Sequence, residues 1–404
     1  MAEREKSERV AGAASLLGEG SARGNIPSFI VMDVMRAAQV QETAGRSIIH
    51  MEVGQSGTPA PKTARLAAMR ALESSTLGYT MALGEEALRE RIAQLYREWY
   101  GVGVAPERVV VTTGSSAAFV LAFLAVFDAR DAVALPSPGY PCYRHILSAL
   151  GQTPVLIETG PAGGWMPTAE DVARASSRDN IKGLLIASPA NPTGTMIAPH
   201  KLAELARVCN ARGVQLISDE IYHGLTYGTR AETALAFTDE AIVVNSFSKY
   251  FSMTGWRIGW MVVPLRLVRA VERLAQNLYI APPAIAQAAA LGAFDGMDEL
   301  EANRRVYAEN RAFLLEALPQ AGFTAFAPPD GAFYLYCDVS HMTNDATAFA
   351  KAMLEEAGVA ATPGVDFDAA RGHRYLRFCY AGTTADMAEG ARRLQAWSQS
   401  RRQA

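Results

Sequence analysis

The chain has 404 residues, half of them hydrophobic and a fifth charged, which is ordinary for a soluble globular protein with room for two domains. Its formal net charge of −3 gives no basic excess, which argues against binding to nucleic acid or to a membrane surface. The four cysteines are scattered without a CxxC pair. This spacing argues against a metal site or a disulfide framework and fits a reducing compartment.

Residues 1–22 are polar, rich in glycine and alanine, and weakly patterned, so we expect a flexible N-terminal extension. Their mixture of arginine and glutamate, without a sustained apolar core, argues against a secretory signal. No later segment approaches the roughly 18 uninterrupted apolar residues that a membrane span needs. These features predict a cytoplasmic protein.

Short apolar runs alternate with helical patterns through the middle of the chain. The predicted strands are residues 108–112, 132–135, 153–157, 183–187, 214–218, 242–245 and 258–263. Between them lie amphipathic stretches such as residues 199–212, whose apolar positions fall on one helical face. This alternation predicts an α/β fold with a mostly parallel sheet between helices, and ligands in such folds bind at the carboxyl ends of the strands.

From about residue 295 the pattern changes. A charged helix (298–318), an alternating strand (332–336), a helix (345–357), a strand (375–379) and a C-terminal helix from residue 384 predict a smaller α+β domain. We therefore predict a large domain over residues 61–294 and a small domain over 295–404. Residues 23–60 are expected to pack with the small domain.

Gly114, Ser115 and Ser116 follow a predicted strand and open an apolar helix. Exposed backbone amides, two hydroxyls and the positive end of a helix make a cradle for phosphate. The alternative is a serine that caps the helix at an ordinary βα turn.

Polar residues also end three other strands. Asp219 could pair with a protonated ring nitrogen, or could simply cap a helix, and Tyr222 could donate to a phenolate oxygen. Asn191 lies in a turn dense in proline and glycine, which is either a rigid connection or a positioned amide. Tyr140 could stack on a planar ligand or pack on the domain surface.

Two cationic residues stand in suggestive places. Arg377 lies inside an apolar strand, either as a paired structural charge or as a clamp for a carboxylate. Lys249 is one of only six lysines against 32 arginines, and it follows an apolar run among hydroxyls and Arg257. A lysine in this setting could form an imine with an aldehyde while its neighbours hold a phosphate.

The order of these motifs resembles the class I/II aminotransferase family, the fold-type I enzymes that use pyridoxal 5′-phosphate (PLP). The resemblance extends from residues 25–29 to Arg377. The motifs in family order are Gly54, 78–80, Gly84, 88–90, 113–116, 137–141, 191–194, 219–222, 246–249, 255–259, 329–334 and Arg377. It implies a large domain with a mostly parallel seven-stranded sheet and a smaller α+β domain.

The resemblance also implies the catalytic roles. Lys249 would bind the cofactor as an imine and act as general base, and nearby cations such as Arg257 are expected to favour its neutral form. Asp219 would pair with the pyridine nitrogen, and Tyr222 and Asn191 would hydrogen-bond the ring's 3′ oxygen. Tyr140 would stack on the ring.

Binding roles follow in the same way. The phosphate would be held by Ser115, Ser116, Ser246 and Arg257, and Gly114 and Ser248 are also expected to bind the cofactor. Arg377, Asn191 and the backbone at Gly54 would bind the substrate α-carboxylate. Tyr79 resembles the tyrosine that reaches the phosphate of the neighbouring protomer, which implies a homodimer.

The implied reaction is ping-pong transfer of an amino group from an L-amino acid to a 2-oxo acid such as 2-oxoglutarate or pyruvate. Ser116 stands where some aspartate-preferring relatives carry a lysine, and no second arginine is evident, so a neutral or aromatic donor is expected. A PLP-dependent C–S lyase of the same fold remains an alternative, because the motifs do not specify the leaving group. A PLP-binding regulator is a further alternative, although only about 25 residues precede the first motif.

Overall fold

The computed structural model describes residues 20–403. The predicted extension 1–22 therefore lies outside the described residues except for its last three. Within residues 20–403, no helix combines the length and the apolar character that crossing a bilayer requires.

A seven-stranded sheet with the order β2-β8-β7-β6-β5-β3-β4 forms the larger layer. Its strands are β2 (Val109–Thr112), β3 (Ala132–Ser137), β4 (Thr153–Glu158), β5 (Gly183–Ala187), β6 (Gln215–Asp219), β7 (Ile242–Ser246) and β8 (Gly259–Val262). All seven predicted strands are present; β5 has the predicted ends, and the ends of the others differ by at most two residues. The predicted α/β fold is confirmed.

One strand of this sheet runs against the others. Strand β8 is antiparallel to both β2 and β7, whereas the remaining neighbours are parallel. An antiparallel strand begins at the edge where its parallel neighbours end. The segment that leads into β8 therefore meets the loops that follow β2, β5, β6 and β7, and all the polar motifs gather at one edge.

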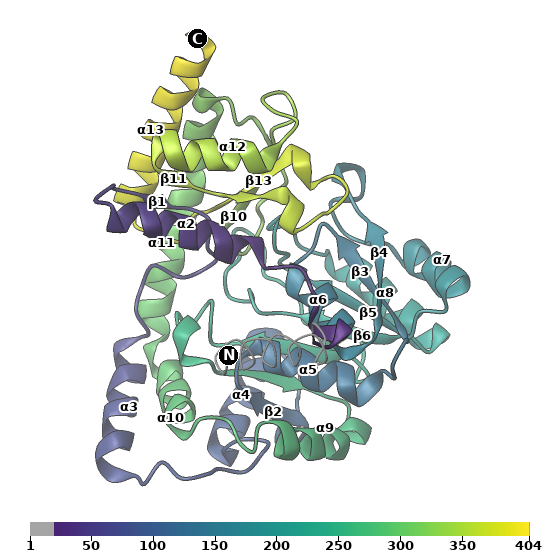
Figure 1. Cartoon of the computed structure of the whole chain (residues 1–404). Helices are drawn as coiled ribbons and strands as arrows, with labels where there is room; N and C mark the ends of the chain where they lie inside the picture. The colour runs from purple at the N-terminus through teal and green to yellow at the C-terminus, as the bar shows by residue number, and fades with distance from the viewer. Residues whose placement is uncertain (1–19, 404) are drawn as a thin grey trace, which may run out of the picture.

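Helices cover both faces of the sheet (Figure 1). They are α4 (Glu86–Tyr100), α5 (Ser115–Val126), α6 (Pro141–Leu150), α7 (Ala169–Asp179), α8 (Pro199–Arg212) and α9 (Leu265–Leu278), while α3 (Lys62–Ser74) packs against α10 (Ala284–Ala293) to one side of the sheet. Neighbouring strand residues enter different cores: Leu184 and Ile186 join one hydrophobic cluster, and Leu185 joins the other, with α5 and α9. Burial on both faces explains why these strands read as continuous apolar runs.

A smaller antiparallel sheet has the order β12-β13-β10-β9. Its strands are β9 (Ala325–Phe326), β10 (Tyr334–Asp338), β12 (Thr362–Pro363) and β13 (Tyr375–Cys379), and α11 (Met297–Ala317), α12 (Ala346–Ala352) and α13 (Thr384–Gln403) accompany it. The prediction for residues 332–336 was wrong in two respects. Strand β10 begins at Tyr334, after Ala332 with a φ of 58°, and its first four residues are all buried instead of alternating.

The start of the described chain packs against its C-terminal part. Helix α2 (Ile30–Thr43) lies beside the C-terminal elements in Figure 1, and β1 (Ile49–His50) pairs in parallel with β11 (Val359–Ala360). The backbone amides of Ile30 and Val31 donate to the Asp366 carboxylate at 3.3 and 3.2 Å. These contacts support the proposed association of residues 23–60 with the small domain.

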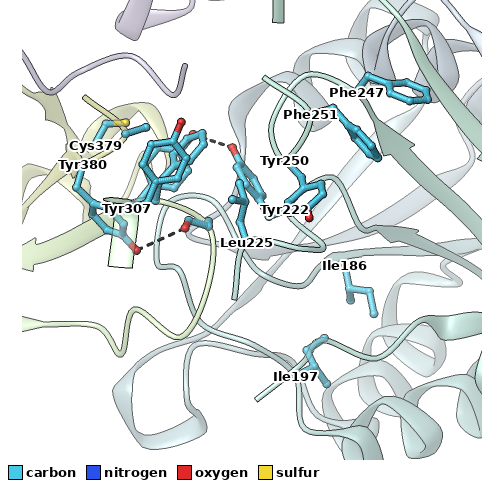
Figure 2. Close-up of a cluster of buried hydrophobic side chains, with 14 of the residues drawn as sticks. Ile186, Ile197, Tyr222, Leu225, Phe247, Tyr250, Phe251, Tyr307, Cys379 and Tyr380 are labelled. Atoms are coloured by element: carbon cyan, nitrogen blue, oxygen red, sulfur yellow. Dashed lines mark hydrogen bonds between the residues drawn. The ribbon is translucent and has the colours of Figure 1, made fainter. Parts of the chain in front are cut away.

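The two sheets share one continuous core. In Figure 2, Phe247 and Phe251 lie on one side of the cluster, Tyr307 and Tyr380 lie on the other, and Tyr222 lies between them. The loops at the carboxyl edge of the large sheet therefore pack against the small sheet through this shared core.

Candidate active site

A cavity of about 520 Å³ opens at this edge, and both sheets and α2 contribute to its wall. Its volume suits a small-molecule site. The predicted site residues that line it are Gly54, Ser115, Ser116, Tyr140, Asn191, Asp219, Tyr222, Ser248, Lys249, Arg257 and Arg377. Gly114 and Ser246 contact the lining residues Arg257 and Ser248, whereas Tyr79 is not part of the lining.

One end of the cavity is built for an anion. Strand β2 ends at Thr112 and α5 begins at Ser115, so the first amides of a helix face the space. Gly114 has a φ of 82°, and a Cβ there would stand 2.4 Å from Nη2 of Arg257. Glycine is therefore required for Arg257 to approach the helix. Within residues 20–403, Arg257 forms no ion pair with a carboxylate, and its Nη1 donates to the Thr254 carbonyl at 2.9 Å.

The two serines after β7 differ in position. The Ser248 side chain lines the cavity, whereas the Ser246 hydroxyl bonds to the Ile258 carbonyl at 3.0 Å and to Ser248 Oγ at 2.8 Å. Ser246 therefore orients Ser248 and ties the loop to β8. Thr254, which the sequence did not single out, also lines the cavity and donates to the Ser248 carbonyl at 2.8 Å.

Lys249 lies at the centre of the wall, and its Nζ donates to the Gly54 carbonyl at 2.5 Å. The pKa of Lys249 is lowered to about 8, mainly by burial; Arg377 and Arg257 also lower it, and Cys379 and Asp219 act in the opposite direction. The expected influence of nearby cations is present, but desolvation is the larger cause. A neutral amine is accessible near neutral pH.

Asp219 ends β6 and is 3% exposed. Its Oδ1 accepts the Ile221 amide at 3.1 Å and its Oδ2 accepts the hydroxyl of Tyr143. Burial raises the pKa of Asp219 to about 6, while the Tyr143 hydroxyl, the Ile221 amide and Lys249 act in the opposite direction. A buried carboxylate of this kind is suited to a cationic partner.

Tyr222 bonds to a tyrosine of the small sheet. The hydroxyls of Tyr222 and Tyr334 are 2.7 Å apart, and their rings meet edge to face at 5.7 Å. A Cβ at position 54 would stand 1.8 Å from the Tyr334 hydroxyl, so Gly54 is required for this approach. The three residues come from different layers and meet only in the folded chain.

Arg377 is 2% exposed and has no carboxylate within ion-pair distance in the part of the chain that the structure describes. Its Nη1 donates to Asn191 Oδ1 at 2.8 Å, and its Nη2 donates to the Glu52 carbonyl. The guanidinium lies over the rings of Tyr334 and Phe367, at 4.3 and 4.7 Å from their centres. A buried cation held only by neutral groups is more suited to clamp an anion than to serve as half of a structural pair.

The remaining wall is apolar and comes largely from α2 and the residue before it. Phe29, Val31, Met32 and Met35 line it together with Val53. Sequence reasoning missed all of them, and it also missed Tyr143 and Tyr334. Tyr143 could have been found, because it lies three residues after Tyr140, the N-cap of α6, and this spacing places two side chains near each other at a helix start.

This donor set fits PLP. It combines a lysine with a lowered pKa, a buried carboxylate for the ring nitrogen, and an anion cradle in which Gly114 leaves no room for a side chain. When bound, PLP supplies an aldehyde and an electron-withdrawing ring. The fold and the site thus define an enzyme of the fold-type I class.

Comparisons with known proteins agree. The family described as "Aminotransferase class I and II" matches residues 46–394. The valine–pyruvate aminotransferase of Mycobacterium tuberculosis is 48% identical over 379 residues, which cover 93% of this chain and 97% of the relative. A solved aminotransferase structure from the same organism superposes with a TM-score of 0.92 at 47% identity, covering 95% of this chain and 99% of the other. A solved structure from Silicibacter pomeroyi superposes with a TM-score of 0.89 at 54% identity and covers 95% of this chain and 100% of the other.

The chain therefore belongs to the class I and II aminotransferase family. It is a PLP-dependent aminotransferase that moves the amino group of an amino acid to a 2-oxo acid. Of the activities that the motifs left open, these relatives support amino transfer and not the lyase or the regulator.

Proposed function

We propose that the chain transfers the amino group of a neutral aliphatic amino acid such as valine to a neutral 2-oxo acid such as pyruvate. The observation that carries this proposal is the apolar wall of the cavity, where we place the side chain of the substrate. Phe29, Val31, Met32 and Met35 give it an apolar wall. The three cations that line the cavity, Lys249, Arg257 and Arg377, each have another proposed role. The printed name of the M. tuberculosis relative supports the same pair of substrates.

The proposed roles follow from the contacts described above. Lys249 holds and moves a proton at Nζ, since its lowered pKa makes the neutral amine accessible. Asp219 keeps the ring nitrogen protonated, and Tyr222 bonds to the ring's 3′ oxygen. Arg377 and Asn191 bind the substrate α-carboxylate; Nη1 of Arg377 lies 2.8 Å from Oδ1 of Asn191.

The remaining cofactor contacts follow in the same way. The start of α5 with Gly114, Ser115 and Ser116, together with Ser248 and Arg257, holds the phosphate. Ser246 supports Ser248 from behind, and Tyr140 covers one face of the ring.

A panel of amino-acid donors with pyruvate as acceptor tests the substrate proposal. We expect kcat/KM for valine and other neutral donors to exceed that for aspartate and glutamate by at least about tenfold, because an unpaired carboxylate in the apolar end costs several kcal/mol. Equal efficiency with aspartate would refute the proposal. Lys249→Ala serves as the inactive control.

A substitution at Ser116 sharpens this test. Ser116→Lys places a cation in the cavity, so we expect the aspartate-to-valine ratio of kcat/KM to rise. Ser116→Met fills similar space without the charge and should lower both efficiencies together. If both variants changed the ratio equally, side-chain charge would not control the preference.

We also propose a cytoplasmic homodimer. The side chain of Tyr79 is 87% exposed, and the nearby Met81, Leu72 and Met69 are 71%, 63% and 56% exposed. A cluster of exposed apolar residues along α3 and the segment after it supports a surface that a second copy covers. Light scattering coupled to gel filtration should give the mass of two chains, and a single-chain mass at micromolar concentration would contradict it.

A further inference from the structure

We propose that Tyr143 is a positioning residue for the reaction, which holds Asp219 as an anion aimed at the ring nitrogen of PLP. This inference rests on the proposed pairing of Asp219 with that nitrogen. It adds a residue that faces the cofactor's partner and not the cofactor itself.

In the part of the chain that the structure describes, the Tyr143 hydroxyl has one hydrogen-bond partner, and its ring is packed on two sides. Tyr143 lies in the first turn of α6 and is 3% exposed. Its ring packs edge-on against Phe119 at 5.1 Å and against Tyr140 at 5.2 Å. The packing directs the hydroxyl at Oδ2 of Asp219, to which it donates.

Asp219 depends on neutral donors. The Ile221 amide takes Oδ1 and the Tyr143 hydroxyl takes Oδ2, so each carboxylate oxygen is oriented by one donor. The titratable groups that act on Asp219, or on which Asp219 acts, are Tyr140, Tyr143, Glu220, Tyr222 and Lys249. Lys249 is the only cation among them, and its lowered pKa makes it a weak counter-ion. The anion therefore relies on these two neutral donors, of which the Tyr143 hydroxyl is the one that a side-chain substitution can remove.

The chemistry of a phenol suits this task. Burial raises the pKa of Tyr143 well above its ordinary value, and the charge of Asp219 raises it further, so the phenol keeps its proton and remains a donor. A donor to a carboxylate favours the charged form. Without it the pKa of Asp219 rises, and the proton shared with the ring nitrogen shifts toward the carboxylate.

Tyr143→Phe removes the oxygen and keeps the ring. The first measurement is the ¹⁵N resonance of PLP labelled at the pyridine nitrogen, which we expect to move toward the unprotonated position. The second is the affinity of the apoenzyme for PLP, which should fall roughly tenfold near neutral pH, as expected for a lost hydrogen bond to a charged group. The pH below which PLP affinity declines should be higher in the variant than in the wild type. We expect kcat to fall while KM for the amino acid stays the same.

Two further variants separate the possible explanations. Phe119→Leu loosens the packing beside Tyr143 but leaves the donor, so its nitrogen resonance should match the wild type. In an Asp219→Asn background, Tyr143→Phe should have no additional effect on the resonance or on PLP affinity.

The failures are distinguishable. If Asp219→Asn leaves the resonance unchanged, the pairing of Asp219 with the ring nitrogen is wrong and the inference falls with it. If Asp219→Asn moves the resonance but Tyr143→Phe does not, the pairing stands and the role of Tyr143 is refuted. Additive effects of the two substitutions would refute that role as well.

Discussion

At the scale of single residues, the site holds charges that are buried without partners of opposite sign. Among residues 20–403, Arg377 donates to the Asn191 side chain, the Glu52 carbonyl and the Thr362 hydroxyl and lies over aromatic faces, and Asp219 accepts from an amide and a phenol. Removing such charges from water costs free energy that a bound partner of opposite charge offsets. The site therefore favours ligands that bring an anion to Arg377 and a cation to Asp219.

Arg377→Lys keeps the positive charge but loses the planar pair of donors. We expect KM for the amino acid to rise roughly tenfold or more, because bidentate binding of the carboxylate is lost, while PLP affinity stays unchanged. Steady-state kinetics and a PLP titration check this. Arg371→Lys is the matched control, since Arg371 bonds to Asp368 and to two carbonyls outside the cavity and should leave KM unaltered.

His50 forms a half-buried ion pair behind the site. Its Nδ1 lies 2.8 Å from Oε1 of the fully buried Glu52, and its Nε2 lies 3.2 Å from Glu42. The hydrogen bond with Glu52 is the main cause that raises the pKa of His50 to about 9, against the opposing effect of burial. Protonated His50 therefore stabilises the folded protein. This contribution is fully present below pH 6.5, the pKa of His50 in the unfolded chain, and is lost as the pH rises through about 9.

His50→Gln should therefore destabilise the protein most at about pH 6 and least at about pH 10. Urea unfolding of both proteins at several pH values measures the difference in midpoint. A deficit that stays constant over this range would mean that the charge of His50 does not contribute.

Sequence reasoning found the residues whose chemistry is visible in their own motif. Lys249, Asp219, Asn191 and Arg377 are of this kind, and the structure brings all four to one cavity. Tyr143 and Tyr334 were missed, because a tyrosine becomes part of a site only through the partner that folding brings to its hydroxyl.

At the scale of elements, the strands of the large sheet could be predicted because each is a short apolar run between turn residues. Their order could not, since it is set by which helices cross over which face. Helix α2 was also missed as part of the site. Its first amides bond to Asp366, which is more than 300 residues away along the chain, so no local sequence pattern predicts these contacts.

Asp366 caps the start of α2 from a distant segment, and we expect Asp366→Ala to cost about 0.5–2 kcal/mol, the range for loss of a capping side chain. KM for valine should rise as well, because α2 supplies the apolar wall. Urea unfolding and kinetics measure both effects. Asp366→Asn retains an acceptor and should lose less stability; equal losses would show that capping is not the cause.

At the scale of the whole molecule, the site lies between two sheets and Tyr79 lies outside it. If Tyr79 serves the second copy, defects in Tyr79 and Lys249 should complement each other. A heterodimer of one Tyr79→Ala chain and one Lys249→Ala chain would contain one intact site. We expect it to show about half the wild-type turnover per dimer at limiting PLP, far above either homodimer.

Heterodimers purified through two different tags provide the measurement. If Tyr79 acted within its own chain, both sites of the heterodimer would be defective, and its turnover would not exceed that of the Tyr79→Ala homodimer.

The pairing of α2 and β1 with segments near residues 359–366 also sets the order in which parts of the enzyme can form during synthesis. A ribosome completes every strand of the large sheet, with Asp219 and Lys249, before it makes Arg377. Residues 30–53 must wait for the last quarter of the chain before their own partners exist. The residues that face the cofactor are thus synthesised first. Arg377, which we propose binds the substrate carboxylate, is added only near the end of translation.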